Sequence, residues 1–367
     1  MRKLYLLGLF VVILLASCQG GKTEAADAQV VAPPESEPTF VPTETPEEIP
    51  TSTDEALSAV TVSLSVIDTL INPGGSGNGP IYSLDWAPDG VMVAAAGYER
   101  VDLWNVATEE RVRLLTGNEG FVWGVDWSPD GKWIAAASDG GTVMVWDALS
   151  GEASQTYEIA GAFCLNWSPE SDRLAVGTKS GVLYVLDTLS EEITSQTSTD
   201  DLIIAVKFSP LGELLAIGKL NGEVEVYETG DLELLNTLDE DIRQRRDANG
   251  LDWSPDGTML ASAHQDGAVR IWDVASGELI RSFRANYNWI RGIAWSSDGE
   301  IIAAAGSDVR VRLWEAETGE ILAESLEHDR PVWCVSWSPD GDYLATGEGA
   351  YESKDSRSNL LIWEIQE

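Results

Sequence analysis

The sequence predicts an all-β fold, namely a seven-bladed β-propeller of four-stranded blades. Three features that recur together support this prediction. A short turn motif returns seven times at steps of 40 to 45 residues, an aromatic residue always ends the strand before it, and further apolar strands follow it. Repeats of this length with four short strands are typical of propeller blades, which bury both faces against their neighbours. One ring therefore accounts for residues 60–367, although the chain length alone would suggest two domains.

The turn motif ends the first strand of each repeat. Its usual form is Ser-Pro-Asp-Gly, as at residues 128–131, 254–257 and 338–341. Proline suits the second position of a tight turn, aspartate bonds the local backbone, and glycine accepts a positive φ. An aliphatic residue lies two positions before each aromatic, a period-2 pattern that predicts a strand. We interpret the aromatic residues before the turns as packing between sheets; they are Trp86, Trp127, Trp167, Phe208, Trp253, Trp295 and Trp337.

Three more strands follow each turn. The second is apolar, as at residues 133–137, and a short turn that often contains Asp-Gly leads to the third. A hairpin turn such as residues 150–152 then leads to a short fourth strand, as at 279–283. The third strands end in a residue that we also assign to packing between sheets, and these residues are Trp104, Trp146, Leu186, Tyr227, Trp272, Trp314 and Trp363.

The two ends of the repeat region complement each other. The last repeat stops four residues after Trp363 and has no fourth strand, whereas residues 61–71 alternate like a strand but belong to no repeat. We expect this segment to complete the last blade and close the ring, because closure removes exposed sheet edges.

With these repeats the chain resembles the WD-repeat (tryptophan-aspartate) family over residues 60–367. The resemblance implies a seven-bladed propeller whose top face binds partners. The family often carries Gly-His before the first strand of a blade, but here only His328 has that place and Gly117-Asn118 stands there in the second repeat. We therefore expect the family's hydrogen-bond networks of His, Asp, Ser or Thr and Trp to be complete in few blades.

The composition limits the possible functions. The chain has 61 acidic and 23 basic residues, a formal net charge of −38, and residues 60–367 carry −32 of it. Such a field repels nucleic acid and anionic lipid, so we expect a neutral or cationic protein or peptide partner. The sequence has two histidines and no recognisable catalytic or phosphate-binding motif. We expect a monomeric, non-enzymatic protein without a cofactor; the alternative is an enzyme or a small-ligand or metal-binding protein, calcium included, that uses the central channel.

The N-terminal residues predict export. Residues 1–17 combine a basic start with an apolar run of 13 residues, which suits a signal peptide and is too short to span a bilayer. The run ends Leu15-Ala16-Ser17-Cys18, which resembles the lipobox of bacterial lipoproteins. It implies lipidation of Cys18 and anchoring to the bacterial cell envelope; the alternative is an ordinary secretory signal. Residues 18–59, rich in Pro, Thr and Glu, predict a disordered tether.

The strongest candidate site is the position that opens the innermost strand of each repeat, four residues before the aromatic. It holds Tyr82, Trp123, Phe163, Ile204, Asn249, Arg291 and Trp333. The positions two residues earlier include Phe121 and Trp289, and the family resemblance implies that both positions face partners at the channel mouth. Aromatic residues and arginine dominate interface hot spots. The predicted partner-binding residues are therefore Tyr82, Phe121, Trp123, Phe163, Trp289, Arg291 and Trp333; the alternative is that they plug the channel.

Two cysteines and two insertions complete the candidates. Cys164 and Cys334 share a repeat position that otherwise holds Ser, Gly or Ala, so we expect buried packing residues and no mutual disulfide. Insertions at 239–247 and 349–358 lengthen loops that the family geometry places on the top face. They are either recognition loops or neutral surface insertions.

Overall fold

The computed structural model describes residues 63–71, 80–238, 247–284, 289–325, 328–349 and 358–366. The predicted signal peptide, Cys18, the tether and most of both insertions lie outside these ranges. Within them the chain forms 27 strands and no helix, which confirms the all-β prediction. Accordingly, this part of the chain offers no helix that could cross a membrane.

Five four-stranded sheets and one seven-stranded sheet contain all strands of the described ranges. The four-stranded sheets have the following strand orders: β12 (Glu192–Ser198), β11 (Val182–Asp187), β10 (Arg173–Thr178), β9 (Ala162–Trp167); β13 (Ile203–Phe208), β14 (Leu214–Lys219), β15 (Val224–Glu228), β16 (Leu234–Leu238); β17 (Ala248–Trp253), β18 (Met259–His264), β19 (Ala268–Asp273), β20 (Leu279–Arg284); β21 (Ile290–Trp295), β22 (Ile301–Gly306), β23 (Val311–Glu315), β24 (Ile321–Glu324); and β1 (Ser63–Ile71), β27 (Asn359–Gln366), β26 (Tyr343–Glu348), β25 (Val332–Trp337). All pairings are antiparallel, as the sequence of short turns requires.

The seven-stranded sheet contains two repeats joined by one long strand. Its order is β2 (Ser83–Trp86), β3 (Met92–Ala96), β4 (Tyr98–Asn105), β5 (Glu110–Trp127), β6 (Trp133–Ser138), β7 (Thr142–Asp147) and β8 (Ala153–Glu158). Residues 110–116 and Phe121 of β5 pair with β4, and residues 122–127 pair with β6. The strand thus serves as the fourth strand of the first repeat and the first strand of the second.

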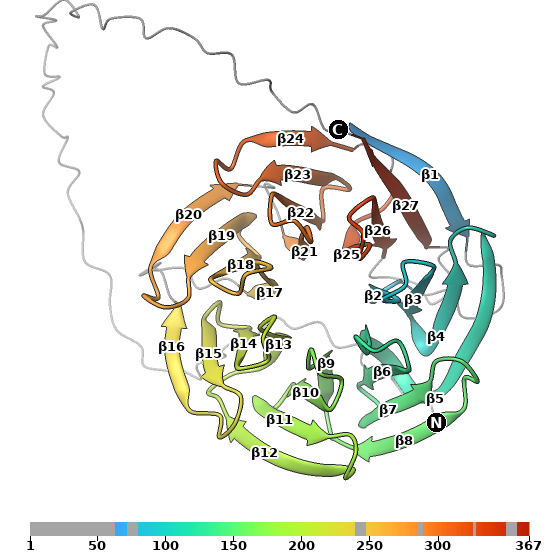
Figure 1. Ribbon diagram of the computed structural model, residues 1–367, viewed down its shortest axis with the longest axis vertical. Coiled ribbons are helices and arrows are strands. Elements are labelled where there is room, and N and C mark those ends of the chain that lie inside the picture. Colours follow the sequence, from blue (N-terminus) through green and yellow to red (C-terminus); the bar gives the residue numbers. More distant parts are fainter. Residues whose placement is uncertain are drawn as a thin grey trace, which may run out of the picture. The chain divides into compact units, whose positions relative to one another are not determined.

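The segment before the first repeat pairs with the last strand. β1 runs antiparallel to β27, with Ser63 opposite Gln366 and Ile71 opposite Asn359. Figure 1 shows β1 outermost beside β27, and it shows first strands such as β9, β13 and β17 innermost, with β12, β16 and β20 on the outside. The expected pairing of this segment is therefore present over residues 63–71, and residues 61 and 62 lie outside the described ranges.

The turns follow the predicted chemistry. In the second repeat, the Ser128 hydroxyl donates to Asp130 Oδ1 at 2.7 Å and accepts the Trp133 N–H at 2.9 Å. Gly131 has a φ of +75° and donates its N–H to the Ser128 carbonyl at 2.8 Å. A residue with a Cβ would be strained at that φ, which explains the glycine.

The core lies between adjacent sheets. All seven aromatic residues before the turns are at most 8% exposed, and the seven residues at the third-strand ends are at most 5% exposed. One apolar cluster joins Val143 and Val145 of β7 to Leu165 and Trp167 of β9, in the next repeat. The prediction that these tryptophans pack between sheets is confirmed.

The two described cysteines occupy crowded positions as free thiols. A Cβ added to Gly177 would lie 2.6 Å from Cys164 Sγ, and one added to Gly347 would lie 2.6 Å from Cys334 Sγ. Burial raises the pKa of Cys164 to about 12 and also raises that of Cys334, so both thiols are protonated and poorly nucleophilic at neutral pH. This geometry agrees with a packing role.

Candidate functional site

The seven predicted partner-binding residues lie within the described ranges and gather into one group. Tyr82 immediately precedes β2 and Trp289 immediately precedes β21, whereas Phe163 and Trp333 lie on inner strands β9 and β25. The inner strand of each repeat contacts the inner strands of the neighbouring repeats, so equivalent repeat positions come together. We call the group Tyr82, Phe121, Trp123, Phe163, Trp289, Arg291 and Trp333 the aromatic cluster.

Tyr82 is at the centre of the aromatic contacts. Its ring centroid lies 4.6 Å from that of Trp123, 5.5 Å from Phe121 and 5.2 Å from Trp333. Trp123 in turn stacks on Phe163, with the centroids 5.0 Å apart and the planes 26° apart. Pairs at these distances and angles stabilise one another beyond the apolar area that they bury.

Two cations contact the aromatic faces. The Arg291 guanidinium carbon lies 3.9 Å from the Trp333 ring centroid and 5.6 Å from that of Trp289. Lys179 Nζ lies 5.4 Å from the Trp123 centroid and 5.7 Å from that of Phe163. Contacts therefore run without a break from Trp289 through Arg291 and Trp333 to the other rings.

Exposure divides the cluster. Trp333 is 6% exposed and cannot offer its ring to a partner, whereas Trp289 is 38% exposed. The other five residues are half-buried, so each presents part of its surface. The cluster thus has an internally packed part, as the plug alternative expects, and an accessible part, as the binding alternative requires.

The two remaining repeats differ at the same position. Ile204 is half-buried, and Asn249 donates its side-chain N–H to the Ile290 carbonyl at 2.7 Å. Asn249 therefore ties β17 to β21 and adds no aromatic surface. The aromatic cluster covers only the repeats whose sequence supplies aromatic residues or Arg291.

A second group, which the sequence reading missed, lies three residues further along the same strands. In each of four repeats a polar side chain accepts the backbone N–H of the aromatic residue before the turn of the next repeat. The pairs are Asp85 to Trp127 at 2.8 Å, Asp126 to Trp167 at 2.7 Å, Asn166 to Phe208 at 2.9 Å and Asp252 to Trp295 at 2.7 Å. The signal was a recurrent polar residue inside otherwise apolar strands. We call Asp85, Asp126, Asn166, Lys207 and Asp252 the inner polar belt.

The charges of this belt act on one another. Burial, together with repulsion from Asp126, raises the pKa of Asp85 to about 8. Burial also raises the pKa of Asp126 to about 6 and that of Asp252 above its ordinary value, although the nearby Lys207 opposes both shifts. Burial alone would lower the pKa of Lys207, but the three aspartates raise it. The belt therefore carries a fixed ammonium and carboxyl groups that titrate above the usual aspartate range.

Two buried networks contain the histidines. Trp363 donates its indole N–H to Thr346 Oγ1 at 2.8 Å, and that oxygen lies 3.1 Å from His328 Nε2. Trp272 similarly donates to Ser262 Oγ at 2.8 Å, which lies 2.8 Å from His264 Nε2. His264 is on strand β18, so it completes its network from a different place in the repeat than His328. Ser262 and His264 are 0% and 4% exposed, so this serine-histidine pair is structural.

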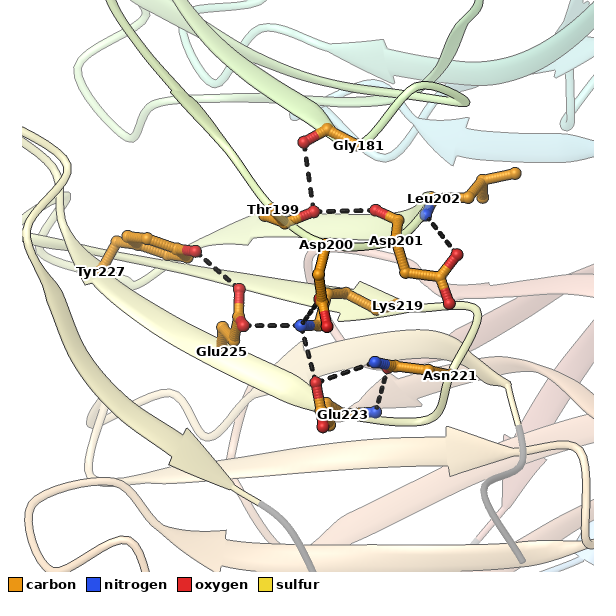
Figure 2. A network of polar contacts seen from close by, with 10 residues as sticks. All are labelled: Gly181, Thr199, Asp200, Asp201, Leu202, Lys219, Asn221, Glu223, Glu225 and Tyr227. Atoms are coloured by element: carbon orange, nitrogen blue, oxygen red, sulfur yellow. Dashed lines mark hydrogen bonds and ion pairs between the residues drawn. The ribbon is translucent and has the colours of Figure 1, made fainter.

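The fourth repeat replaces that network with a buried lysine (Figure 2). Lys219 Nζ lies 2.7 Å from Asp200, 2.7 Å from Glu223 and 2.6 Å from Glu225, and the Lys219 side chain is 1% exposed. Tyr227, at the third-strand position, donates its hydroxyl to Glu225 at 2.6 Å. These carboxylates are close enough together to hold a metal ion, but the ammonium already lies among them. The network thus stabilises the repeat with an internal cation.

The comparisons with known proteins agree with this architecture. The family model "WD domain, G-beta repeat" matches residues 109–147. The model "Anaphase-promoting complex subunit 4 WD40 domain" matches residues 165–244, 240–290 and 284–340. The chain therefore contains WD40 repeats, and the resemblance to this family is confirmed for these residues.

Similar curated proteins match only short stretches. WD repeat and SOCS box-containing protein 1 of Mus musculus is 35% identical over 79 residues, 21% of this chain and 18% of that protein. The Chromatin assembly factor 1 subunit FAS2 homolog of Oryza sativa subsp. japonica is 28% identical over 102 residues, 27% and 20% of the two chains. COMPASS component SWD1 of Saccharomyces cerevisiae is 30% identical over 74 residues, which are 19% of this chain and 17% of that protein. The chain thus spans about a fifth of each relative's length.

Proposed function

We propose that this protein is a non-enzymatic WD-repeat propeller that binds a protein or peptide partner through the aromatic cluster. The observation that carries the proposal is the unbroken series of contacts among aromatic rings and cations, most of which keep accessible surface. Structural packing alone would not require such residues at the opening of several inner strands, since Ile204 and Asn249 fill the same position elsewhere. Aromatic residues and arginine are the residue types that contribute most to protein interfaces.

The proposed ring has seven blades and is closed by β1. The count is supported by β5, which contributes to two four-stranded units, and by the pairing of β1 with β27. Hydrogen bonds between the first and last repeats also support closure: Ile81 N–H donates to the Glu348 carbonyl at 3.0 Å, and Trp86 Nε1 donates to the Ser336 carbonyl at 3.1 Å.

The names of the relatives favour a binding role. One is a subunit of a chromatin assembly factor and another is a component of COMPASS, so both are named as parts of larger assemblies. For this chain, the formal charge of −32 over residues 60–367 favours a neutral or cationic partner, which a monomeric propeller would bind.

The test of the site begins with crosslinking on intact cells to identify the partner. The purified full-length protein and a Trp123→Ala, Phe163→Ala, Trp289→Ala variant are then compared in binding to that partner. The variant includes the exposed Trp289 and leaves the buried Trp333 unchanged, so that the core stays intact. We expect at least a hundredfold loss of affinity, because each truncated hot-spot residue typically costs more than about 1 kcal/mol.

The matched control is Leu149→Ala, Leu189→Ala, which removes two exposed side chains at hairpin turns (88% and 84% exposed). It should bind like the original protein, and thermal melts should show that both variants are folded. Equal affinity of the triple variant and the original protein would overturn the site assignment.

We also propose that Cys18 is lipidated and that the protein is anchored to the bacterial cell envelope. The basic start, the apolar run and the sequence Leu15-Ala16-Ser17-Cys18 support this proposal. Metabolic labelling with a fatty-acid analogue should mark the protein, and Cys18→Ser should lose the label and leave the membrane fraction. An unchanged label in the variant would refute the anchor without bearing on the aromatic cluster.

A further inference from the structure

The faces of the aromatic cluster already bind cations within the molecule. Both Lys179 and Arg291 lie within 6 Å of two ring centroids each. The negative face of an aromatic ring attracts a cation at this distance, with an energy of roughly 0.5–1 kcal/mol at exposed sites. The rings are therefore placed to recognise positive charge, and the two cations differ in how firmly they are held.

Arg291 is the firmly held cation. It is half-buried and lies 3.9 Å from the centroid of Trp333, which is itself buried. A guanidinium this close to the face of a buried indole packs against it, which restrains both groups. Arg291 therefore belongs to the packed part of the cluster.

Lys179 is held loosely. Its side chain is 36% exposed, its Nζ lies more than 5 Å from both ring centroids, and its ion pair with Asp139 is 3.5 Å long. Ion pairs of this exposure contribute about 0–1 kcal/mol. Because lysine has a flexible stem, Lys179 can leave the Trp123 and Phe163 rings with little loss of stability.

We propose that the stacked Trp123 and Phe163 rings bind a lysine or arginine side chain of the partner, which displaces Lys179. This inference rests on the proposed function and names the partner chemistry of the same site. Asp139 is the adjacent carboxylate; its Oδ1 accepts the Phe121 N–H at 2.7 Å, which fixes its position, and its Oδ2 pairs with Lys179. The incoming cation would take over this second oxygen.

The charge of the molecule favours the same occupant. With a formal net charge of −32 over residues 60–367, the protein raises the local concentration of cations and repels anions. An acidic partner side chain would have to approach Asp139 and the negative ring faces, although Lys179 and Arg291 would attract it. Lys179 therefore competes with a cationic partner side chain for the rings but would attract an anionic one. Removal of Lys179 should strengthen binding of a cationic partner and weaken binding of an anionic one.

The test uses full-length protein and three pentapeptides, acetylated and amidated: Gly-Gly-Lys-Gly-Gly and its norleucine and glutamate counterparts. Binding is measured by isothermal titration calorimetry for every variant, and in proteins that keep Trp123 also by the NMR shift of its indole N–H. We expect the lysine peptide to bind at least fivefold more tightly than the norleucine peptide. Lys179→Ala should tighten lysine-peptide binding about two- to fivefold, the equivalent of the 0.5–1 kcal/mol of an exposed cation–π contact, and Trp123→Leu should abolish it.

The matched control is Lys132→Ala, which removes the same charge at a turn, where Lys132 pairs with Asp130. It should change lysine-peptide affinity less than Lys179→Ala does. The proposal is overturned if the norleucine or glutamate peptide binds as tightly as the lysine peptide, or if Lys179→Ala weakens lysine-peptide binding. In that case, loss of the crosslinked partner by the triple variant would still support the proposed function.

Discussion

The aromatic cluster and the inner polar belt lie three residues apart on the same strands, yet they make different kinds of contact. Four side chains of the belt accept backbone N–H groups of the next repeat, as Asp126 does for Trp167. Residues of the cluster contact one another only through side chains, as Trp123 and Phe163 do. Because every repeat has these backbone groups, the fold itself constrains the residues of the belt. The residues of the cluster are constrained by one another and by the partner that they bind. Substitutions in the belt should therefore affect stability, and those in the cluster should affect binding.

The largest expected difference comes from Asp126→Ala. This change leaves the Trp167 N–H and the Asn166 side-chain N–H without their acceptor in a buried place. Each buried donor left unsatisfied costs about 1–3 kcal/mol, so we expect the free energy of unfolding to fall by about 3 kcal/mol in urea denaturation. Asp126→Asn keeps an acceptor oxygen and should lose less than half as much. Equal losses would mean that the hydrogen bonds are not the cause.

The second difference is the pH dependence of stability. The pKa values of about 8 for Asp85 and about 6 for Asp126 exceed the ordinary aspartate value, so between pH 5 and 8 the folded state binds more protons than the unfolded state. Stability should therefore fall as the pH rises through this window, by about 1.4 kcal/mol per pH unit for each extra proton that the folded state binds. The raised pKa of Lys207 affects stability only at pH values above this window. Turn aspartates such as Asp130, whose pKa is lowered, titrate at pH values below this window.

Urea denaturation of the original protein and of Asp85→Asn between pH 5.5 and 8.5 would measure this slope. We expect the slope to shrink in the variant, because the most strongly shifted carboxyl group is absent. A flat profile in the original protein would refute the electrostatic account of the belt.

The smallest expected effect on stability is that of Trp123→Leu. The leucine still fills apolar space, and the loss is limited to the ring contacts with Tyr82, Phe121 and Phe163 and the cation contact with Lys179, about 1–2 kcal/mol in sum. The same variant should lose partner binding. A loss of stability as large as that of Asp126→Ala would place the cluster with the structural core and undermine the contrast between the two regions.

The repeat pattern made most of the fold predictable. Tight turns, period-2 strands and the aromatic residues before the turns depend on local chemistry, and the structure has them where the sequence indicates. The membership of the aromatic cluster was also predictable, because equivalent positions of successive repeats come together once the strand order is known. The burial of Trp333 was not, since it depends on Arg291 and Tyr82 packing against it from other repeats.

The polar networks escaped sequence reasoning for a different reason. Asp85, Asn166 and Lys207 share one repeat position but differ in charge, so no single residue type marks the belt. His264 and Lys219 each end the second strand of their repeats. Only the packed structure reveals that His264 completes a network with a tryptophan and that Lys219 completes a network with carboxylates. These partners come from separate strands and loops, and their distances are set by tertiary packing.

The long strand β5 determines how the molecule can come apart. Hydrogen bonds to β4 and to β6 extend along one continuous backbone, so opening either ladder strains the other. Native-state hydrogen exchange would therefore detect residues 83–158 as one cooperative opening unit of two repeats. A fragment boundary or a circular permutation placed between these two repeats would cut inside a strand, whereas residues 159–161 offer a junction between strands.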